Sequence, residues 1–243
     1  MALAVPQILA SSRNSATSLT RTFGSAVGAG SLLVAHGAVF NSGGSGEPTV
    51  SDTVNGTWTG YSTTGYFTSG DADSEIYLWS FPNSAAGTPA VTMNPPGTSS
   101  DNDLTLFEIT GAATSSPRDV SVTNTGVFTT SATTSVVTGT LAQAAEIIIS
   151  SFSHTGGDVT LTEDTGDSFT LADENQLNST GQTFNVQYKI VAATTSLTVN
   201  GTIGSNAGEN KTWFTGVASF KEAAGGKAFP PFHRSQRFFR RSA

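Results

Sequence analysis

The chain has 243 residues, of which 37% are hydrophobic and 12% are charged, with no cysteine and a formal net charge of −7. The missing cysteines exclude a disulfide framework and thiolate chemistry. Serine, threonine and glycine together make 94 residues, and this excess disfavours helices and favours strands and turns. The length is sufficient to bury a substantial core. We therefore expect a folded, all-β protein.

Strand candidates recur along the chain between Gly, Asn, Pro and Ser turns. The N-terminal segment MALAVPQIL has no basic residue before its apolar part and is interrupted by Pro6. It therefore predicts a first strand rather than a signal peptide, and a protein made in the cytoplasm. No apolar run approaches the roughly 18 residues that a membrane span needs. Later strands are expected at 31–40, 74–82, 104–110, 145–153, 183–192, 196–203 and 212–221.

Two of these segments alternate with the period of a strand. In 74–81, Ile76 and Leu78 share one face and Tyr77 and Trp79 share the other. In 183–191, apolar side chains alternate with a polar set. The polar set is Asn185, Gln187 and Lys189. This second pattern predicts a strand with one dry face and one face in solvent.

The turns complete the prediction of the fold. The tetrapeptide V-N-G-T occurs at 54–57 and again at 199–202, and Asn-Gly is the preferred pair of a two-residue hairpin turn. These two copies are too short to indicate an internal repeat, and we expect none. Short strands with regular turns predict a two-sheet antiparallel β-sandwich of jelly-roll-like topology, followed by an extended C-terminal tail.

A change of composition at Gly225 divides the chain into a body, residues 1–224, and a tail, residues 225–243. The body carries all 18 acidic residues and six basic ones, a net charge of −12, whereas the tail carries five basic residues and no acid, a net charge of +5. Pro230 and Pro231 exclude a helix or a central strand there. The tail also concentrates phenylalanine and arginine. Its candidate docking residues are Phe229, Phe232, Arg234, Arg237, Phe238, Phe239, Arg240 and Arg241.

Several motifs of the body resemble a known group of proteins. They are T-F-G-S-x-V-x-A-G-S-L-L-V-A at 22–35, V-S-D-T-x-N-G-T-W-T at 50–59, the aromatic strand 76–79, E-I-T-G at 108–111, and the strands 145–152 and 213–220. Over residues 1–222 this pattern resembles Gly/Ser/Thr-rich β-sandwich proteins of tailed phages and prophages, virion decoration or fibre-type structural proteins. The resemblance implies a structural module located in the virion.

Candidate catalytic groups are few. The histidines are His36, His154 and His233, and no G-x-S-x-G nucleophile elbow occurs. His36 lies within an apolar strand, so a core histidine is the ordinary interpretation, whereas His154 ends a strand and is the better site candidate. Carboxylates cluster at 163–174, which is typical of a solvated acidic loop as well as of a glycosidase pair. We expect no enzyme and no cofactor.

The loops contain acidic residues that could bind a metal ion. Acidic residues stand two apart at Asp71, Asp73 and Glu75 and at Asp101 and Asp103. This spacing suits calcium, but no complete calcium loop is present, and turn residues explain it equally well. We therefore expect no metal.

The aromatic residues of 56–68 form a possible carbohydrate contact, in which sugar rings would stack on exposed side chains. The residues are Trp58, Tyr61 and Tyr66, with Phe67 beside them. The alternative is that Trp58 belongs to the core and the others are ordinary strand positions facing a second sheet.

These observations predict a phage virion structural protein of the capsid decoration (cement) or head-fibre type, attached to a capsid or other virion protein through its tail. The alternative is a host-recognition module of a tail fibre that binds cell-surface carbohydrate. The strongly acidic body would be repelled by phosphates, so a nucleic-acid partner is not expected. A membrane partner is not expected either. We expect a closed homo-oligomer, a dimer or a trimer.

Overall fold

The computed structural model describes residues 1–11, 17–40, 47–61, 68–69, 72–97, 101–154, 160–164, 166–175, 183–204 and 211–224. These residues contain strands and turns and no helix, so none of their elements is a helix that could cross a membrane. Every pairing between strands is antiparallel. The prediction of an all-β, sandwich-like protein is confirmed.

The strands form four sheets, where the sequence predicted two. The first outer sheet has the order β2 (Leu19–Thr22), β9 (Ala90–Asn94), β4 (Thr49–Asp52), β5 (Gly56–Thr57). The first inner sheet has the order β1 (Ala4–Leu9), β10 (Asp101–Thr110), β3 (Leu32–Phe40), β8 (Ala72–Phe81), β6 (Thr59–Tyr61), and β7 (Thr68–Ser69) also pairs with β8. The second inner sheet has the order β11 (Arg118–Phe128), β18 (Lys211–Lys221), β13 (Ala145–His154), β16 (Thr183–Ala192), β15 (Thr170–Asn175). The second outer sheet has the order β12 (Ala132–Val137), β17 (Thr198–Ile203), β14 (Leu161–Thr162).

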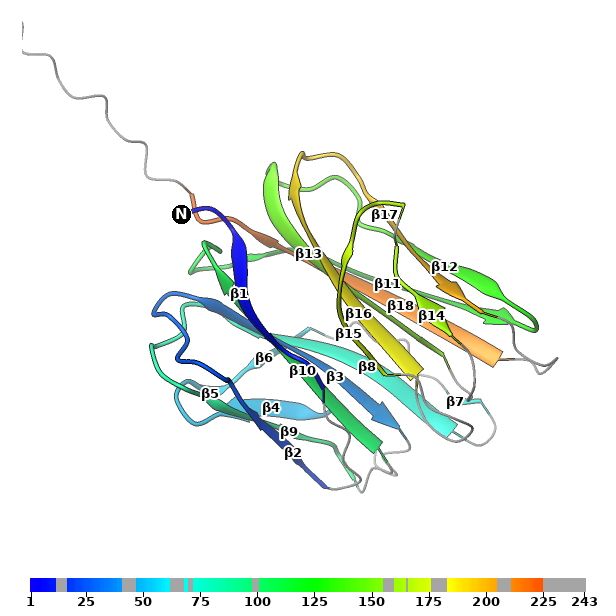
Figure 1. Ribbon diagram of the computed structural model, residues 1–243, viewed down its shortest axis with the longest axis horizontal. Coiled ribbons are helices and arrows are strands. Elements are labelled where there is room, and N and C mark those ends of the chain that lie inside the picture. The colour runs from blue at the N-terminus through cyan, green and yellow to red at the C-terminus, as the bar shows by residue number, and fades with distance from the viewer. Residues whose placement is uncertain are drawn as a thin grey trace, which may run out of the picture.

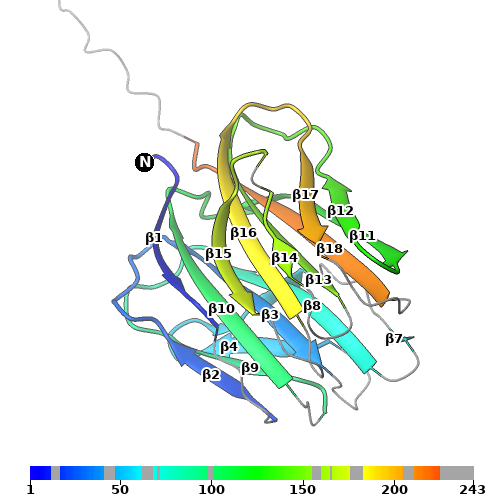
Figure 2. The ribbon, with the colours of Figure 1, turned by 45° about the vertical axis from the view of Figure 1, so that its right-hand side comes forward.

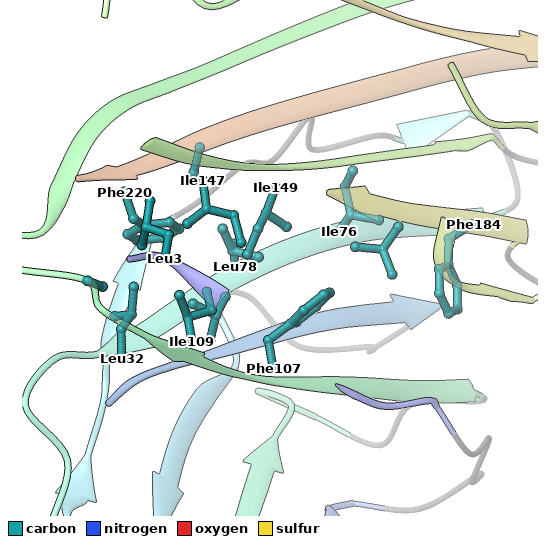
Figure 3. Close-up of a cluster of buried hydrophobic side chains, with 14 of the residues drawn as sticks. Leu3, Leu32, Ile76, Leu78, Phe107, Ile109, Ile147, Ile149, Phe184 and Phe220 are labelled. Carbon is teal, nitrogen blue, oxygen red and sulfur yellow. The ribbon is translucent and has the colours of Figure 1, made fainter. Parts of the chain in front are cut away.

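The sheets stack in four layers, with the two inner sheets face to face in the middle (Figures 1 and 2). One apolar cluster, which includes Leu33, Trp79 and Met93, fills the space between the first outer and first inner sheets. A second cluster joins the two inner sheets (Figure 3). Two further clusters, around Phe152 and Ile148, lie between the second inner and second outer sheets. The molecule therefore has three layers of core.

The inner strands are apolar on both faces because both faces are covered. In β3, whose sequence is LLVAHGAVF, eight of nine residues are buried. Such runs are expected where a sheet is covered on two sides, whereas a half-exposed sheet alternates. The prediction of two unlike faces for 74–81 is confirmed, because Ile76 and Leu78 face the second inner sheet while Tyr77 and Trp79 face the first outer sheet.

The prediction of a solvent-facing side on 183–191 is wrong for its central residues. Asn185 and Gln187 of β16 are fully buried, because the second outer sheet and its loops cover this face. The Gln187 Oε1 accepts a hydrogen bond from the Asp164 backbone N–H at 2.8 Å, and its Nε2 donates to the Asn200 carbonyl at 3.4 Å. The buried Gln187 side chain is thus satisfied by backbone groups, whereas the Asn185 side chain has no hydrogen-bond partner among the described residues.

Only one of the two V-N-G-T segments is a turn. The first connects β4 to β5, but through the three residues 53–55 rather than the predicted two-residue Asn-Gly turn, because Asp52 pairs with Gly56, which has a positive φ of 85°. The second lies within β17, paired with β12 along its whole length, so the prediction of a hairpin there is wrong. The reason is packing. A Cβ on Gly201 would lie 2.6 Å from the Phe152 ring, so glycine leaves room for that ring rather than forming a turn.

The beginnings and ends of several strands meet at one end of the molecule, which we call the terminal pole. It is defined by the start of β1, the end of β10 and the end of β18, and Ala4 pairs with Thr110 there. The N-terminus lies beside the last described residues of the body (Figure 1). The segment that joins β10 to β11 starts at the same pole, because β10 ends at Thr110.

Candidate functional site

The predicted docking residues of the tail, from Phe229 to Arg241, lie outside the described residues. The structure does place the point at which the tail leaves the body, which is Glu222 to Ala224 at the terminal pole. This exit point is the described part of the candidate site, and it decides how a docked tail is connected to the core.

The exit point is clamped by the segment that joins the two halves of the chain. Ala112 and Glu222 form an isolated antiparallel bridge. The Ala113 N–H donates to the Lys221 carbonyl at 2.9 Å, and the Ala223 N–H donates to the Gly111 carbonyl at 2.7 Å. Gly111 has a φ of 77°, and a Cβ at this position would lie 2.3 Å from the Ala2 carbonyl oxygen. Only glycine suits this crossing, because L-residues rarely adopt that φ.

A second set of bonds holds the exit point from the other side. The Glu222 N–H donates to the Ala145 carbonyl at 3.0 Å. The Gln143 Nε2 donates to the Glu222 carbonyl at 3.1 Å and to the Ala145 carbonyl at 2.7 Å. Residues 222–223 are thus bonded to the junction segment and to the start of β13. The last described residues before the tail belong to the folded body.

Two buried carboxyl groups lie near this pole. Glu108 accepts hydrogen bonds from the Gly28 N–H at 2.7 Å, the Ser31 hydroxyl at 2.8 Å and the Gln7 Nε2 at 2.7 Å. Glu146, on β13, is also buried, and its Oε1 accepts from the Gln143 N–H at 3.2 Å. Burial raises the pKa of Glu146, and the nearby Asp119 carboxylate adds to this effect. These groups fix loops at the pole and face inward.

Trp58, one of the three aromatic residues of the possible carbohydrate contact, is buried. This side chain is only 4% exposed, and its indole N–H donates to Asp52 Oδ2 at 2.6 Å. Its ring packs between the first two sheets, so it offers no face for stacking on a sugar. The core interpretation of Trp58 holds. Tyr61 belongs to β6 by its backbone, and Tyr66 and Phe67 lie outside the described residues.

The two histidines of the body are interior residues. His36 is fully buried, its ring lies 5.2 Å from that of Phe184, and burial lowers its pKa to about 3. His154 is also fully buried and meets the Phe128 ring edge-on at 5.9 Å. The prediction for His36 as a core residue is confirmed, whereas the strand end at His154 is covered rather than accessible. His233 lies outside the described residues.

In the acidic segment 163–174, Asp164 and Asp173 stabilise two different parts of the fold. Asp164 is nearly buried, and it accepts from the Asn200 N–H at 2.8 Å and the Asp167 N–H at 3.1 Å, which holds the turn after β14. Asp173 accepts from the Thr105 hydroxyl at 2.5 Å and from the Ser11 N–H at 2.6 Å. It therefore ties β15 to the first inner sheet. Two acidic residues of the expected solvated loop are therefore hydrogen-bonded to other segments of the body.

Where the structure describes them, the acidic residues with calcium-like spacing are hydrogen-bonded to other side chains of the chain. Glu75 is buried and accepts a hydrogen bond from the Tyr77 hydroxyl, and Asp103 accepts from the Asn175 Nδ2 at 2.9 Å. Among the described residues, no group of three or more His, Asp or Glu side chains is arranged to hold a metal ion. A hollow of about 250 Å³ lies at the end of β16, below the roughly 300–1,000 Å³ typical of ligand pockets. Its lining includes Ile190 and Leu197.

Sequence reasoning missed the clamp at the exit point and the buried carboxyl groups beside it. One signal was present, because Glu108 is a charged residue within the apolar strand LTLFEIT. A carboxylate at such a position requires buried donors. The clamp left no signal, because Ala112 and Ala223 act through their backbones.

Comparison with models of protein families, with curated proteins and with solved structures finds no match. The resemblance to phage structural proteins accordingly depends on the sequence motifs given above.

Proposed function

We propose that this chain is a structural protein of a tailed-phage virion, of the capsid decoration or head-fibre type, which attaches to the particle through residues 225–243. The observation that supports this best is the clamp at the exit point. Residues 222 and 223 are bonded to the junction segment and to the start of β13, so the tail begins from the core of the body. Because the tail starts from a fixed point of the body, docking of the tail would hold the rigid body in a defined position.

The composition of the tail supports docking on a protein surface. It combines four phenylalanines with four arginines and one lysine, and it carries no acid. Aromatic residues and arginine are enriched among the residues that dominate protein interfaces. The body has the opposite net charge. Attachment through the tail leaves the four-layer body projecting from the particle.

The aromatic anchors are expected to contribute more to docking than the charges. Burial of one Phe side chain contributes roughly 1.5–3 kcal/mol, and truncation of a well-packed interface anchor costs about 2 kcal/mol or more. A charge at the rim of an interface acts mainly on the association rate and is screened by salt. Phe238 and Phe239 together are therefore the first residues to test.

The experiment adds purified variants to particles that lack the protein and measures occupancy at low and moderate salt. Phe238→Ala with Phe239→Ala should abolish or strongly reduce occupancy at both salt concentrations. Arg240→Gln with Arg241→Gln, the matched control, should reduce occupancy modestly and mainly at low salt. Full occupancy of the phenylalanine variant would contradict the anchor model. A loss confined to the arginine variant, with steep salt dependence, would instead indicate an electrostatic arm.

The alternative function, recognition of cell-surface carbohydrate by a tail fibre, now rests on Tyr61 and Tyr66, because Trp58 is in the core. Its test is glycan binding by the intact protein. Binding that is lost in Tyr61→Ala with Tyr66→Ala, and retained in the phenylalanine variant above, would support recognition instead of docking.

A further inference from the structure

The chain passes twice through the same arrangement of strands. The first inner sheet has the order β1-β10-β3-β8-β6, and the second has the order β11-β18-β13-β16-β15. The outer sheets follow β2-β9-β4 and β12-β17-β14, and the first of them gains β5. Apart from the short strands β5 and β7, each strand of the first half has a counterpart at the same place in the second half, in the same chain order. The expectation of no internal repeat is contradicted at the level of topology.

The inner strands of the two halves can be aligned so that equivalent residues face the same side of each inner sheet. In the first inner sheet, His36 pairs with Thr105 on one side and Leu78 on the other. In the second, Ser151 pairs with Gly216 and Val186 on the matching strands. Equating His36 with Ser151 makes Ser31 the counterpart of Glu146 and Glu108 the counterpart of Ser219. The first strand of each inner sheet also has a register irregularity near its start.

The same chemistry recurs at these equivalent positions, with the partners exchanged. In the first half, the Ser31 hydroxyl on the β3 side donates to Glu108 on β10 at 2.8 Å. In the second half, the residues at these positions are Glu146 on β13 and Ser219 on β18. One carboxyl and one hydroxyl residue therefore occupy the same two strands in both halves. The two residues have changed places.

A second feature recurs at the ends of β4 and β14. Asp52 is the last residue of β4, is nearly buried, and accepts from the N–H groups of Val54 and Asn55, both at 2.6 Å. Asp164 follows β14, is nearly buried, and accepts from the Asp167 N–H. In each half, one aspartate holds the turn that leaves the third strand of the outer sheet.

The contact between the two halves has the distribution of apolar and polar residues that is found in protein–protein interfaces. Its centre is apolar, with Leu78 and Phe107 from the first inner sheet against Ile149 and Phe184 from the second (Figure 3). Toward one side it has polar contacts, such as Thr105 to Asp173 at 2.5 Å and Asn175 to Asp103 at 2.9 Å. An apolar centre with hydrogen bonds at its margin is typical of docked surfaces.

We propose that residues 1–113 and 117–224 are two copies of one sandwich unit, and that the inner face of each unit is a docking surface whose partner is the other unit. The face carries Leu78 and Phe107 in the first unit and Ile149 and Phe184 in the second. Each unit has its own core between its own two sheets. The contact between units consequently forms without the covalent link. This inference is independent of the proposed virion function.

The experiment uses the full chain with a protease site inserted between Ser115 and Ser116, which are both exposed. After folding and cleavage, the two pieces should remain a 1:1 complex with the mass of the intact chain by size exclusion and native mass spectrometry. After separation in denaturant and mixing under native conditions, the complex should form again. Pieces that separate on cleavage, or that lose their strand signal in circular dichroism, would each overturn the proposal.

Variants of the same cleavable chain test which face is responsible. Ile149→Ala removes apolar contact from the interface and should raise the dissociation constant of the cleaved pieces about tenfold or more. Val137→Ala, on the second outer sheet and 50% exposed, is the matched control and should leave the constant unchanged. Circular dichroism of each uncleaved variant establishes that it folds. Equal constants for the two variants would place the contact elsewhere and overturn the proposal.

Discussion

At the scale of single residues, His36 shows what it costs to place a titratable ring between two sheets. Its imidazole lies in the interface of the two inner sheets, beside Phe184 and opposite Thr105. Both ring nitrogens are buried, and neither has a hydrogen-bond partner among the residues that the structure describes. Burial lowers the pKa from 6.5 to about 3, so the ring stays neutral in the folded protein over the whole range between these values.

The sign of the pH effect follows from this pKa. Below pH 6.5 the unfolded chain binds a proton at His36 and the folded protein does not, so stability falls as the pH falls toward 3. Between pH 7.5 and 4.5 the expected loss is roughly 2–3 kcal/mol, because each pKa unit corresponds to about 1.4 kcal/mol. Urea unfolding should show this loss in the native chain and a correspondingly smaller loss in His36→Leu.

The comparison with His36→Leu separates this residue from the carboxylates. Asp103 on β10 and Asp173 on β15 are the nearest acids that hydrogen bonds place at the same interface, and both remain in the variant. Their contribution to acid unfolding therefore cancels in the difference between the two proteins. An identical pH dependence for both would mean that His36 is protonated in the folded state.

At the scale of elements, a large ring packs against a glycine between the two sheets of each half, but the strands that supply the ring and the glycine differ. In the first half, Gly37 of β3 leaves room for the ring of Trp79 on β8, where a Cβ would lie 2.7 Å from that ring. In the second half, the counterpart of Gly37 is Phe152, and the room is provided by Gly201 of β17. In each sandwich a large ring therefore lies against a glycine, but the ring and the glycine are on different strands in the two halves.

This packing predicts the effect of enlarging Gly201. Gly201→Ala would bring a methyl group within 2.6 Å of the Phe152 ring, which is fully buried. Overpacking of this kind destabilises by about 1–3 kcal/mol, and thermal or urea unfolding measures it. Gly24→Ala is the matched control, because no atom lies within 4 Å of its Cβ. Adding Phe152→Leu to Gly201→Ala should recover part of the loss; the absence of recovery would show that the strain lies elsewhere.

The strands were predictable and their layering was not. Alternation and turn residues located β3, β8, β10, β13, β16, β17 and β18, because these patterns depend on neighbours in the chain. The number of sheets depends on which faces are covered. Asn185 and Gln187 face an interior and are polar, so alternation placed them in solvent. The repeat was hidden for a related reason: equivalent positions hold Gly37 and Phe152, or Ser31 and Glu146.

Of the candidate site, only the unusual composition of the tail could be predicted from the sequence. The tail was recognised from its charge and its phenylalanines, whereas the clamp is made by backbone groups of Gly111, Ala113 and Ala223. Hydrogen bonds between main chains are compatible with almost any sequence, so no motif marks them. The burial of Trp58 was also undecided by sequence, because its partner Asp52 looks like an ordinary turn residue.

At the scale of the whole molecule, the body should fold without the tail. A chain that ends at Ala224 keeps every described strand and the bonds of Glu222 and Ala223, so its thermal midpoint should match that of the full chain within a few degrees. A chain that ends at Lys221 is the control, because it loses the bonds from Glu222 and Ala223 to Ala145 and Gly111. Its midpoint should fall by several degrees, at about 1 kcal/mol per hydrogen bond. Loss of cooperative unfolding in the chain ending at Ala224 would mean that the tail belongs to the core.

The position of β18 has a mechanical consequence for a protein held by its tail. β18 lies between β11 and β13 and pairs with both along nearly its whole length, from Lys211 to Lys221. A pull on Ala224 acts along this strand, so it loads two ladders of hydrogen bonds in shear. In this geometry the bonds resist together, whereas a pull across a strand would open them one at a time. A body tethered in this way stays folded under tension that would unzip a sheet from its edge.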